Sequence, residues 1–541
     1  MSRYIEQRLA IYSTLGVALL LLASGCARGT KMARGVIEAG TLRPAAPAVA
    51  VYGPSATLTC PSGGALKVLQ KGLQDWAKQT GGAVPQPDGR LCAVASTLVG
   101  WGDGPAVPPM SVVAFTLAHF GVAESGTRML FTTVSVEDSK TIGRQLKDSV
   151  VEWLAEDPKG TLGLATYRIK KGTTAVALLF LPSAVELAPV PRTLALNASA
   201  QLVGKVLPPY EKAVVLASDN SGKLSTTKSE GADFKAELKC TGRPGDIIVE
   251  VRAERDGQPR LLDSFTVGCA KPAPANVIVP PAPELPADPA AAEQQLFELA
   301  NRERAAFGVP QLAADGAIAK LARTIAESLR AQARGGSAPA IDVVGALGEA
   351  GVVSSAIVHN PSRSLSISEA QAGFLASPVH RSNMLNPEVT HAGIGVAVDD
   401  QEGTKSVFVS ELFVRELLPV DVASVRTKLE EAISKRRSEA HASVLTPDET
   451  LTDVAQKYAE ELAKNFGEVQ PKREEDLTAP LFKKFKNAKI IMGANPEPLE
   501  LVNDGDVVAA GDVVGVGVAS GTHRTLGKNT PYVVIFVARK R

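Results

Sequence analysis

The segment GFLASPVHRSNMLNPEVTHAGIGV, residues 373–396, decides how the second half of the chain is interpreted. It joins a Ser-Pro pair and two histidines, His380 and His391, to a run of small and β-branched residues. The Ser-Pro pair favours a turn, and the run from Gly393 onward indicates a hairpin that ends near Phe413. The glycines of this run predict close backbone approach in a sheet, because no helix start follows them as a phosphate-binding loop requires.

Two predicted helices lie upstream of this segment. Residues 296–329 carry apolar side chains at helical spacing in two pieces, which the sequence FGVP separates. Asp315 stands just before the second piece, where its carboxylate can accept hydrogen bonds from free backbone amides. We therefore expect a helix, a tight turn and a second helix with Asp315 as its N-cap.

The same pattern recurs without gaps at residues 429–462, and a second glycine-opened hairpin follows at residues 515–537. A fainter third version combines a turn and helix at residues 84–99 with a hairpin at residues 163–181. Repeats of this length indicate duplicated domains rather than a solenoid. Each copy is expected to combine helices and a hairpin in one unit.

The stretch from residue 190 to residue 269 has a different pattern. Short alternating runs are separated by turn residues, which predicts a small all-β sandwich. The Pro-rich stretch that begins at Ala270 predicts a semi-rigid linker. The predicted organisation is a signal peptide at 1–26, a tether at 27–57, a degenerate α/β domain at 58–183, a β-sandwich at 184–270, a Pro-rich linker at 271–290, a mixed domain at 291–418 and its second, degenerate copy at 421–541.

The N-terminus has the pattern of an export signal. Arg3 and Arg8 precede an apolar run that is too short to span a bilayer, and the run leads into LLASGC. The small residues before Cys26 resemble a bacterial lipobox, in which the cysteine is lipidated; the alternative is a plain cleavable signal with a chance cysteine. Acyl chains on Cys26 would anchor the protein in the cell envelope. Ala27 lacks the aspartate that retains some lipoproteins at the inner membrane, which favours the outer membrane.

The remaining cysteines and the charge content bound the chemistry further. Four cysteines fall into two local pairs that an exported chain can oxidise, so we expect disulfides Cys60–Cys92 and Cys240–Cys269. The chain has 58 basic and 57 acidic residues, which leaves a net charge of +1. This balance indicates no nucleic-acid partner.

Four motifs resemble one protein family. NRERAAFGVPQL, LARTIAESL, ASPVHRSNMLNP and HAGIGVAV follow the order and spacing of the CAP superfamily, named for cysteine-rich secretory proteins, antigen 5 and pathogenesis-related proteins. The resemblance covers residues 291–416, extends through the repeat to 421–541, and reaches 58–182 by conjecture. It implies three-layer α-β-α sandwiches. The predicted fold class is therefore α+β, with tandem CAP-like sandwiches and an intervening all-β, Ig-like sandwich.

The resemblance also implies a cleft. In family members with an intact cleft, an early-helix histidine, an acid from a Gly-Glu-Asn segment and a histidine from a Gly-His-Arg segment come together and can bind a divalent metal. Here His380 matches the last histidine, His359 stands where the acid should be, and Ile325 replaces the early histidine. Asn360 is retained. The expected cleft residues are His359, Asn360, Ser377 and His380, and a divalent metal such as zinc would bind His359 and His380.

The altered cleft weakens the case for catalysis. Catalytic zinc needs about three protein ligands, and Glu369 is the remaining acid that could complete the set. Without a metal, His380 is expected to close a turn after Ser377, and His359 to be a polar residue at a strand end. No nucleophile with an orienting base is evident, so no catalytic residue is assigned.

Three functional hypotheses follow. The first is a non-enzymatic envelope lipoprotein that binds or scaffolds a lipid or protein ligand. The second is a metal-dependent CAP protein, with possible hydrolase activity, that uses His359 and His380. The third is a purely structural envelope protein whose repeats supply only surface and length.

Overall fold

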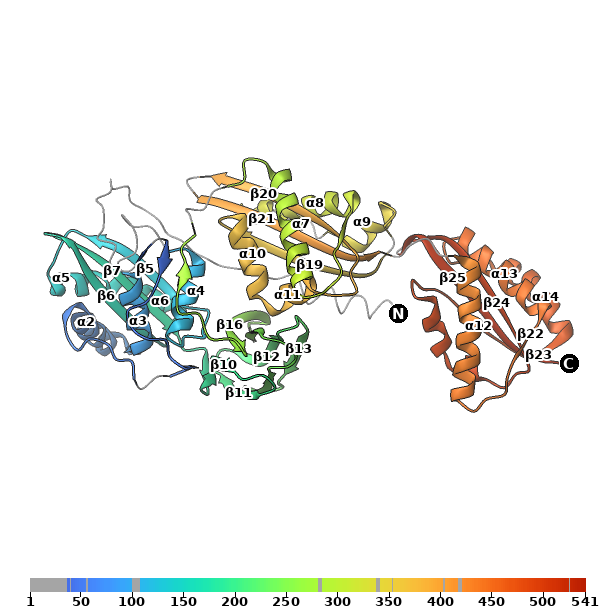
Figure 1. Ribbon diagram of the computed structural model, residues 1–541, viewed down its shortest axis with the longest axis horizontal. Coiled ribbons are helices and arrows are strands. Elements are labelled where there is room, and N and C mark those ends of the chain that lie inside the picture. Colours follow the sequence, from blue (N-terminus) through green and yellow to red (C-terminus); the bar gives the residue numbers. More distant parts are fainter. Residues whose placement is uncertain are drawn as a thin grey trace. The chain divides into compact units, whose positions relative to one another are not determined.

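The computed structural model describes residues 37–38, 40–54, 57–99, 108–280, 285–336, 341–352, 354–401, 404–416, 421–524 and 526–541 (Figure 1). The chain divides into two compact units. Unit 1 contains residues up to Leu285 together with Arg363–Leu385, and unit 2 contains Pro286–Ser362 together with Asn386–Arg541. The predicted signal peptide, Cys26 and the first part of the predicted tether lie outside the described residues.

Unit 1 contains a four-stranded sheet of order β4-β6-β7-β5 with a hydrophobic core on each face. Its helices supply one core from α2, α5 and α6 and the other from α3 and α4. The elements are α2 (Gly64–Thr80), β4 (Gln86–Pro87), α3 (Gly89–Leu98), α4 (Met110–His119), β5 (Arg128–Val134), α5 (Ser139–Gln145), α6 (Lys147–Glu156), β6 (Gly160–Lys170) and β7 (Thr173–Pro182).

The rest of the N-terminal half is all β, as the turn-rich sequence predicted. Two sheets, of order β10-β16-β15-β12-β13 and β14-β11-β8, share one apolar core. Two small pairings flank them, β1-β2-β17 and β3-β9. The strands are β1 (Ile37–Glu38), β2 (Thr41–Leu42), β3 (Val51–Tyr52), β8 (Val185–Leu187), β9 (Val190–Pro191), β10 (Thr193–Leu194), β11 (Ser199–Val206), β12 (Glu211–Ser218), β13 (Leu224–Lys228), β14 (Asp233–Lys239), β15 (Gly245–Arg255), β16 (Gln258–Cys269) and β17 (Val277–Ile278).

Both predicted disulfides are present. Cys60 is bonded to Cys92 on α3, and Cys240 is bonded to Cys269 at the end of β16. Because Cys240 follows β14 and β16 belongs to the other sheet, the second disulfide links the two sheets of the all-β region.

Unit 2 contains two further sheets, of order β18-β20-β21-β19 and β22-β24-β25-β23. The first is formed with α7 (Pro289–Ala306), β18 (Ala313–Ala314), α8 (Gly316–Ala333), α9 (Val343–Glu349), β19 (Ser354–Ser364), β20 (His391–Gln401) and β21 (Thr404–Glu416). The second is formed with α12 (Val422–Glu439), β22 (Thr446–Pro447), α13 (Glu449–Lys464), α14 (Pro471–Lys484), β23 (Phe485–Ala494), η1 (Pro498–Asn503), η2 (Gly505–Val508), β24 (Val513–His523) and β25 (Gly527–Lys540).

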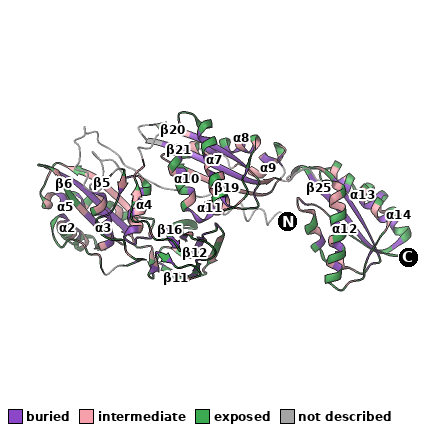
Figure 2. Cartoon of the chain, in the orientation of Figure 1, coloured by how far each residue is buried: buried purple, intermediate pink, exposed green. Residues whose placement is uncertain are grey.

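The three four-stranded sheets share one topology. In each, a two-residue strand pairs parallel with the first strand of an antiparallel hairpin, and a fourth strand lies outside the second hairpin strand. All three predicted hairpins are therefore confirmed. Figure 2 shows buried strands in the sheets and exposed outer faces on the surrounding helices.

Local signals explain how the helices pack on these sheets. Asp315 accepts hydrogen bonds from the amides of Ala317 and Ile318, so the predicted N-cap is confirmed. A Cβ atom on Gly393 would lie 2.2 Å from the backbone nitrogen of Ala319, and one on Gly395 would lie 2.2 Å from the carbonyl carbon of Ala322. The two glycines therefore let α8 lie directly against β20, as expected from the sequence.

A buried arginine ends the first helix of each sheet in unit 2. Arg304 donates to the carbonyl oxygens of Pro310 (2.7 Å) and Asn386 (2.8 Å), and it is fully buried. Arg437 donates in the same way to Ser443 (2.7 Å) and Val507 (2.8 Å). Each guanidinium thus ties the turn after its helix to the loop that leads into the hairpin.

Candidate functional site

The polar residues predicted on β19 lie beside two polar residues of β21, its neighbour in the sheet. His359 Nε2 lies 3.0 Å from Ser410 Oγ, within hydrogen-bonding distance. Asn360 donates from Nδ2 to Glu411 Oε2 over 3.1 Å. Successive strand residues face opposite sides, so these two contacts lie on opposite faces of the sheet. The prediction that His359 stands at a strand end is wrong, because β19 continues to Ser364.

His359 is neutral at physiological pH. Burial lowers the pKa of its imidazole to about 4, because desolvation disfavours the charged form. A neutral imidazole has one nitrogen with a free lone pair, so His359 retains the protonation state that a metal ligand needs.

Glu411 is the residue that sequence reasoning missed. Its side chain is fully buried, and burial raises the pKa of the carboxyl to about 8, an effect that the hydrogen bond from Asn360 opposes. Glu411 Oε1 is buried without a hydrogen-bond partner in the part of the chain that the structure describes. The carboxyl is therefore protonated at neutral pH and unsuited to act as a general base. One signal was available: Glu411 stands within the apolar run from Val407 to Val414, which indicates a strand buried on both faces.

Ser377 and His380 belong to unit 1 and begin a short helix. Ser377 ends α10 (Ile367–Ala376) and occupies the N-cap position of α11 (Pro378–Met384). The His380 ring packs edge-on against Phe374, with ring centroids 5.5 Å apart. The expectation that His380 closes a turn is therefore wrong, because Pro378 starts a helix at its first position.

Glu369 and Ile325 have structural roles. Glu369 Oε2 accepts from the backbone amide of Leu365 over 2.7 Å, while Ser366 Oγ accepts from the amide of Glu369. This reciprocal arrangement caps the start of α10. Ile325 is buried on α8 in an apolar cluster with Leu321.

The predicted metal pair is distributed over both units. His359 and Asn360 lie in unit 2, and Ser377 and His380 lie in unit 1, so the pairing of His359 with His380 stays a prediction. Across the described ranges, no group of three His, Cys, Asp or Glu side chains is placed to hold a metal ion. Catalytic zinc needs about three protein ligands, and the described residues form no such group.

Arg381, next to His380 in the motif, makes polar contacts outside α11. It is buried, and its Nη1 donates to the carbonyl oxygens of Asp219 (3.0 Å) and Asp246 (2.9 Å) in the all-β region. Leu385 packs on the same region, at Gly222. The motif helix is thus a docking element for the all-β region within unit 1.

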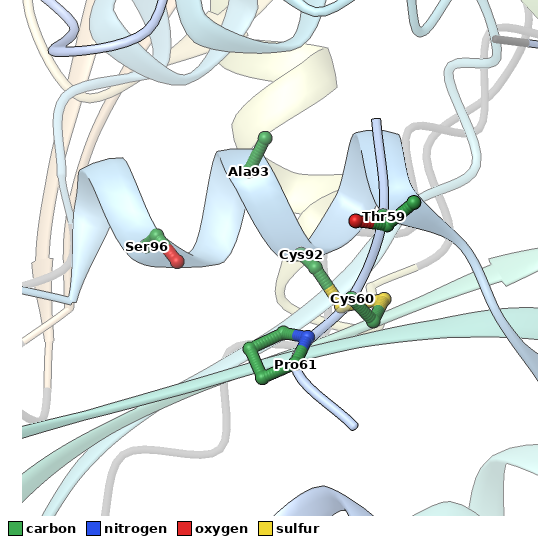
Figure 3. Close-up of a pocket in the computed structure, with 6 residues that line it drawn as sticks. All are labelled: Thr59, Cys60, Pro61, Cys92, Ala93 and Ser96. Atoms are coloured by element: carbon green, nitrogen blue, oxygen red, sulfur yellow. A yellow bond between two sulfur atoms is a disulfide. The ribbon is translucent and has the colours of Figure 1, made fainter. Parts of the chain in front are cut away.

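A small hollow lies beside the first disulfide (Figure 3). It has a volume of about 320 Å³ and is lined by Thr59, Cys60, Pro61, Cys92, Ala93 and Ser96. None of these side chains carries a charge, and both sulfur atoms belong to the disulfide. The hollow therefore offers the hydroxyl groups of Thr59 and Ser96 but no acid or base to activate them.

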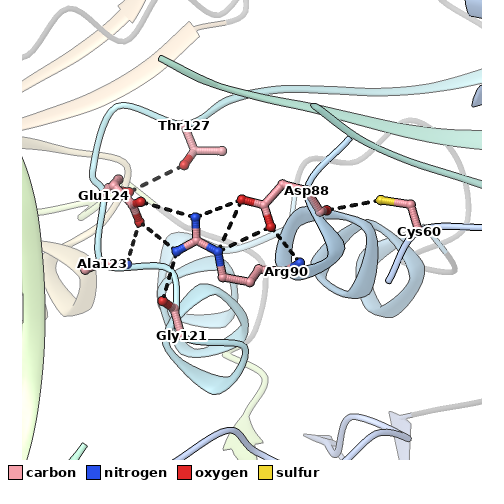
Figure 4. Close-up of polar contacts among 7 residues, drawn as sticks. All are labelled: Cys60, Asp88, Arg90, Gly121, Ala123, Glu124 and Thr127. Carbon is pink, nitrogen blue, oxygen red and sulfur yellow. Dashed lines mark hydrogen bonds and ion pairs between the residues drawn. The ribbon is translucent and has the colours of Figure 1, made fainter. Parts of the chain in front are cut away.

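A second polar cluster surrounds Arg90 at the start of α3 (Figure 4). Its guanidinium forms ion pairs with Asp88 (2.8 Å) and Glu124 (3.3 Å). Asp88 also accepts from the backbone amide of Arg90 as the N-cap of α3. Asp263, on β16, lies buried opposite Glu124, and burial, then the Glu124 charge, raises the pKa of its carboxyl. These contacts join α3 to the neighbouring loop and strand.

The described helices include none that is long and apolar enough to cross a membrane. No curated protein matches the sequence. Similar solved structures include an extracellular SCP-domain protein from Bacillus anthracis (20% identity, TM-score 0.20, covering 32% of this chain). That alignment spans 65% of the Bacillus protein.

Two other solved structures are similar at lower identity. An outer surface protein from Borrelia burgdorferi is 14% identical with a TM-score of 0.21, and the alignment covers 24% of this chain and 96% of that protein. A cysteine-rich secretory protein from Staphylococcus aureus is 12% identical with a TM-score of 0.20, and the alignment covers 49% of this chain and 92% of that protein.

The profile of the cysteine-rich secretory protein family, CAP, matches residues 297–413. The match begins in α7, includes α10 and α11, and ends in β21. It thus covers residues 373–396. The chain therefore contains a domain of the CAP family.

Proposed function

We propose that this protein is a non-enzymatic lipoprotein of the cell envelope, whose CAP domain binds or scaffolds a lipid or protein ligand. The observation that carries the proposal is the contact of Arg381 with Asp219 and Asp246. A motif that supplies a cleft histidine in family members with an intact cleft also holds a second region in place here. That use fits a scaffold better than a catalyst.

The repeated topology supports the same proposal. Three sheets of one strand order fit three tandem CAP-like α-β-α sandwiches at 58–183, 291–418 and 421–541. The two sheets that share a core between them fit an intervening Ig-like sandwich at 184–270. A chain of such units presents a large surface for partners.

Cross-linking in intact cells tests the scaffold. We would compare the full chain with Arg381→Gln, with a His359→Gln/His380→Gln variant, and with Arg302→Gln, an exposed arginine of α7, as a matched control. The scaffold hypothesis expects severalfold fewer cross-linked products for Arg381→Gln and unchanged products for the other two. Loss of products in the histidine variant, with unchanged melting, would contradict it.

The proposed anchor is Cys26, probed separately by labelling with radioactive palmitate. The full chain should incorporate label and fractionate with the outer membrane, and Cys26→Ser should do neither. A labelled Cys26→Ser protein would show that the anchor lies elsewhere.

The metal-dependent alternative is favoured by one observation, the neutral imidazole of His359. Zinc titration of the full chain by calorimetry, with metal analysis, distinguishes it from the main proposal. Stoichiometric binding that vanishes in His359→Ala/His380→Ala would support a metal site and justify hydrolase assays. Equal binding by both proteins would remove that alternative. The purely structural alternative expects no saturable ligand and no effect of either histidine substitution.

A further inference from the structure

Basic side chains gather at one edge of the last sheet. β23 and β25 pair so that Phe485 lies opposite Lys540 and Lys486 opposite Arg539, and the amide of Arg541 donates to the carbonyl of Lys484. Figure 1 shows the end of the chain beside β23. We define the basic edge as seven exposed residues, Lys483, Lys484, Lys486, Lys489, Arg539, Lys540 and Arg541.

Few acidic side chains balance this charge. Lys489 forms an ion pair with Asp506 and Lys540 with Asp448, each over 3.4 Å. Among the described residues, the other five members of the basic edge form no ion pair. Between Asp476 and Glu497 the sequence contains no acidic residue at all. The basic edge therefore carries a strong local excess of positive charge on a chain that is nearly neutral overall.

Exposed apolar side chains accompany the basic edge. Phe482, directly before Lys483, is 70% exposed, and Met492 and Ile490 on β23 are 46% and 36% exposed. Ile490 and Met492 lie opposite Phe536 and Val534, so they share one face of the sheet.

The corresponding edge strand of unit 1 has a different surface. On β5, Met129 and Phe131 are half-buried and pack against the core beside α3 and α4. Strand β23 thus leaves apolar groups in water that its counterpart in unit 1 partly covers.

The chemistry of β23 disfavours another protein strand as the occupant. Lysines and bulges protect a sheet edge from pairing with a neighbouring strand. Here Lys486 and Lys489 flank a register shift, and Asn487 within it has a positive φ of 53°. A second copy of this edge would also bring like charges together. Clustered lysines with exposed aromatic and aliphatic groups instead match an anionic lipid surface, where headgroup charge attracts the lysines and the interface accepts the apolar groups.

We propose that the basic edge, with Phe482, Ile490 and Met492, docks on an anionic bilayer surface. This contact is independent of the proposed lipid anchor and lies in the part of the chain that follows the CAP domain. The last sheet lacks the SPVHR sequence of residues 377–381, and membrane docking would be its own separate function.

Vesicle binding by the unlipidated full chain, Cys26→Ser, tests the proposal. The probes are phosphatidylcholine vesicles with and without phosphatidylglycerol. We expect binding to the phosphatidylglycerol vesicles, weakened by salt, and little binding to phosphatidylcholine alone. Lys483→Gln/Lys484→Gln/Lys486→Gln/Lys489→Gln should weaken binding by up to roughly a thousandfold. Phe482→Ser should weaken it roughly tenfold and leaves every charge in place.

A matched control replaces four exposed lysines of unit 1, Lys67, Lys71, Lys78 and Lys159, by Gln. It removes the same net charge and should bind as the parent does. Equal weakening in the control would overturn the proposal, because net charge alone would then explain binding. Failure of the parent to bind anionic vesicles would overturn it too, as would self-association that only the basic-edge variants abolish. Because the tested chain has no acyl group, none of these results depends on palmitate labelling at Cys26.

Discussion

The CAP region, α7 to β21, and the last region, α12 to β25, have the same sheet topology but different residues at the sheet centre. Ile394 lies opposite Glu411 in the first hairpin, and Val516 lies opposite Ile535 in the second. The glycines on both sides of Ile394 lie against α8, and those on both sides of Val516 lie against α13, which makes the two positions equivalent. Glu411 and Ile535 are both fully buried.

This comparison shows that the sheet topology tolerates a buried polar pair at its centre but does not depend on one. Ile535 pairs with Ile491 on the neighbouring strand, whereas Glu411 accepts a hydrogen bond from Asn360. Since the last sheet closes with two isoleucines, the topology does not require a polar pair. A buried carboxyl with one unpartnered oxygen destabilises its surroundings relative to an apolar residue of similar size.

The largest expected effect comes from the buried arginine that each region contains, Arg304 or Arg437. Arg304→Met leaves the carbonyls of Pro310 and Asn386 without their buried donor, so we expect a loss of about 4 kcal/mol in the stability of the CAP region. Arg437→Met should destabilise the last region by a similar amount. Pulse proteolysis in urea, with fragments identified by mass spectrometry, measures each region separately.

The exposed Arg302→Met is the control for both arginine variants and should behave as the parent. An Arg437→Met protein as stable as the parent would show that the two arginines are not equivalent.

The second prediction concerns Glu411, the buried carboxyl that stands where the last region has Ile535. The pKa of Glu411 is raised to about 8, so the folded state holds a proton that the unfolded state loses near its ordinary pKa. The stabilising contribution of this proton is complete below the unfolded pKa and is lost as pH rises through the folded pKa. The CAP region should therefore lose about 2 kcal/mol between about pH 6 and about pH 8.

Glu411→Ile should remove this loss and make the CAP region resemble the last one. Urea titrations of parent and variant across that pH range provide the measurement, with Ile535→Val as a control that leaves the pH dependence unchanged. A parent whose CAP region is equally stable at both pH values would show that Glu411 ionises normally.

The third prediction concerns His359 and the stability of the CAP region at acidic pH. The pKa of His359 is lowered to about 4, so its contribution to stability is present above the unfolded pKa and lost as pH falls through the folded pKa. Between about pH 6.5 and about pH 5 the loss should be about 1–2 kcal/mol. His359→Met, which places on β19 the residue type that β23 carries at Met492, should flatten the acid limb in the same titration. An unchanged acid limb would mean that other groups set it.

The smallest expected effect concerns Ser377 in the SPVHR motif, which the last region lacks. Its hydroxyl oxygen is buried without a hydrogen-bond partner in the described part of the chain. Ser377→Ala should therefore change stability by less than about 0.5 kcal/mol. Differential scanning calorimetry of the two proteins is sufficient. A clear destabilisation would indicate a buried water or ligand at this hydroxyl.

Sequence reasoning succeeded for several features whose signal lies in one stretch of sequence. Asp315 caps a helix that begins at the next residue, and each disulfide joins cysteines that are neighbours among the cysteines of the chain. The hairpins were also predictable, because turn glycines and alternating strands lie in one short window.

The residues that were missed depend on distant partners. Nothing near Arg381 in the sequence indicates that its guanidinium reaches the carbonyls of Asp219 and Asp246. Glu411 could have been placed in the core from the apolar run that surrounds it, but its pairing with Asn360 requires knowing that β19 lies beside β21. For the cleft, the sequence identified the residue types, and the structure assigned roles to Glu369 and Ile325 that the motif alone could not give.

The positions of the disulfides divide the protein by redox sensitivity. All four paired cysteines lie in unit 1, bridging sequence separations of 32 and 29 residues, and residues 286–362 and 386–541 contain no cysteine. A bridge over a loop of this size stabilises a domain by about 3 kcal/mol. Thiol reagents therefore act on one compact unit and leave the other untouched. Oxidation of cysteines is thus a requirement of the first unit alone, and the arginine-tied sheets of the second can form in any redox environment.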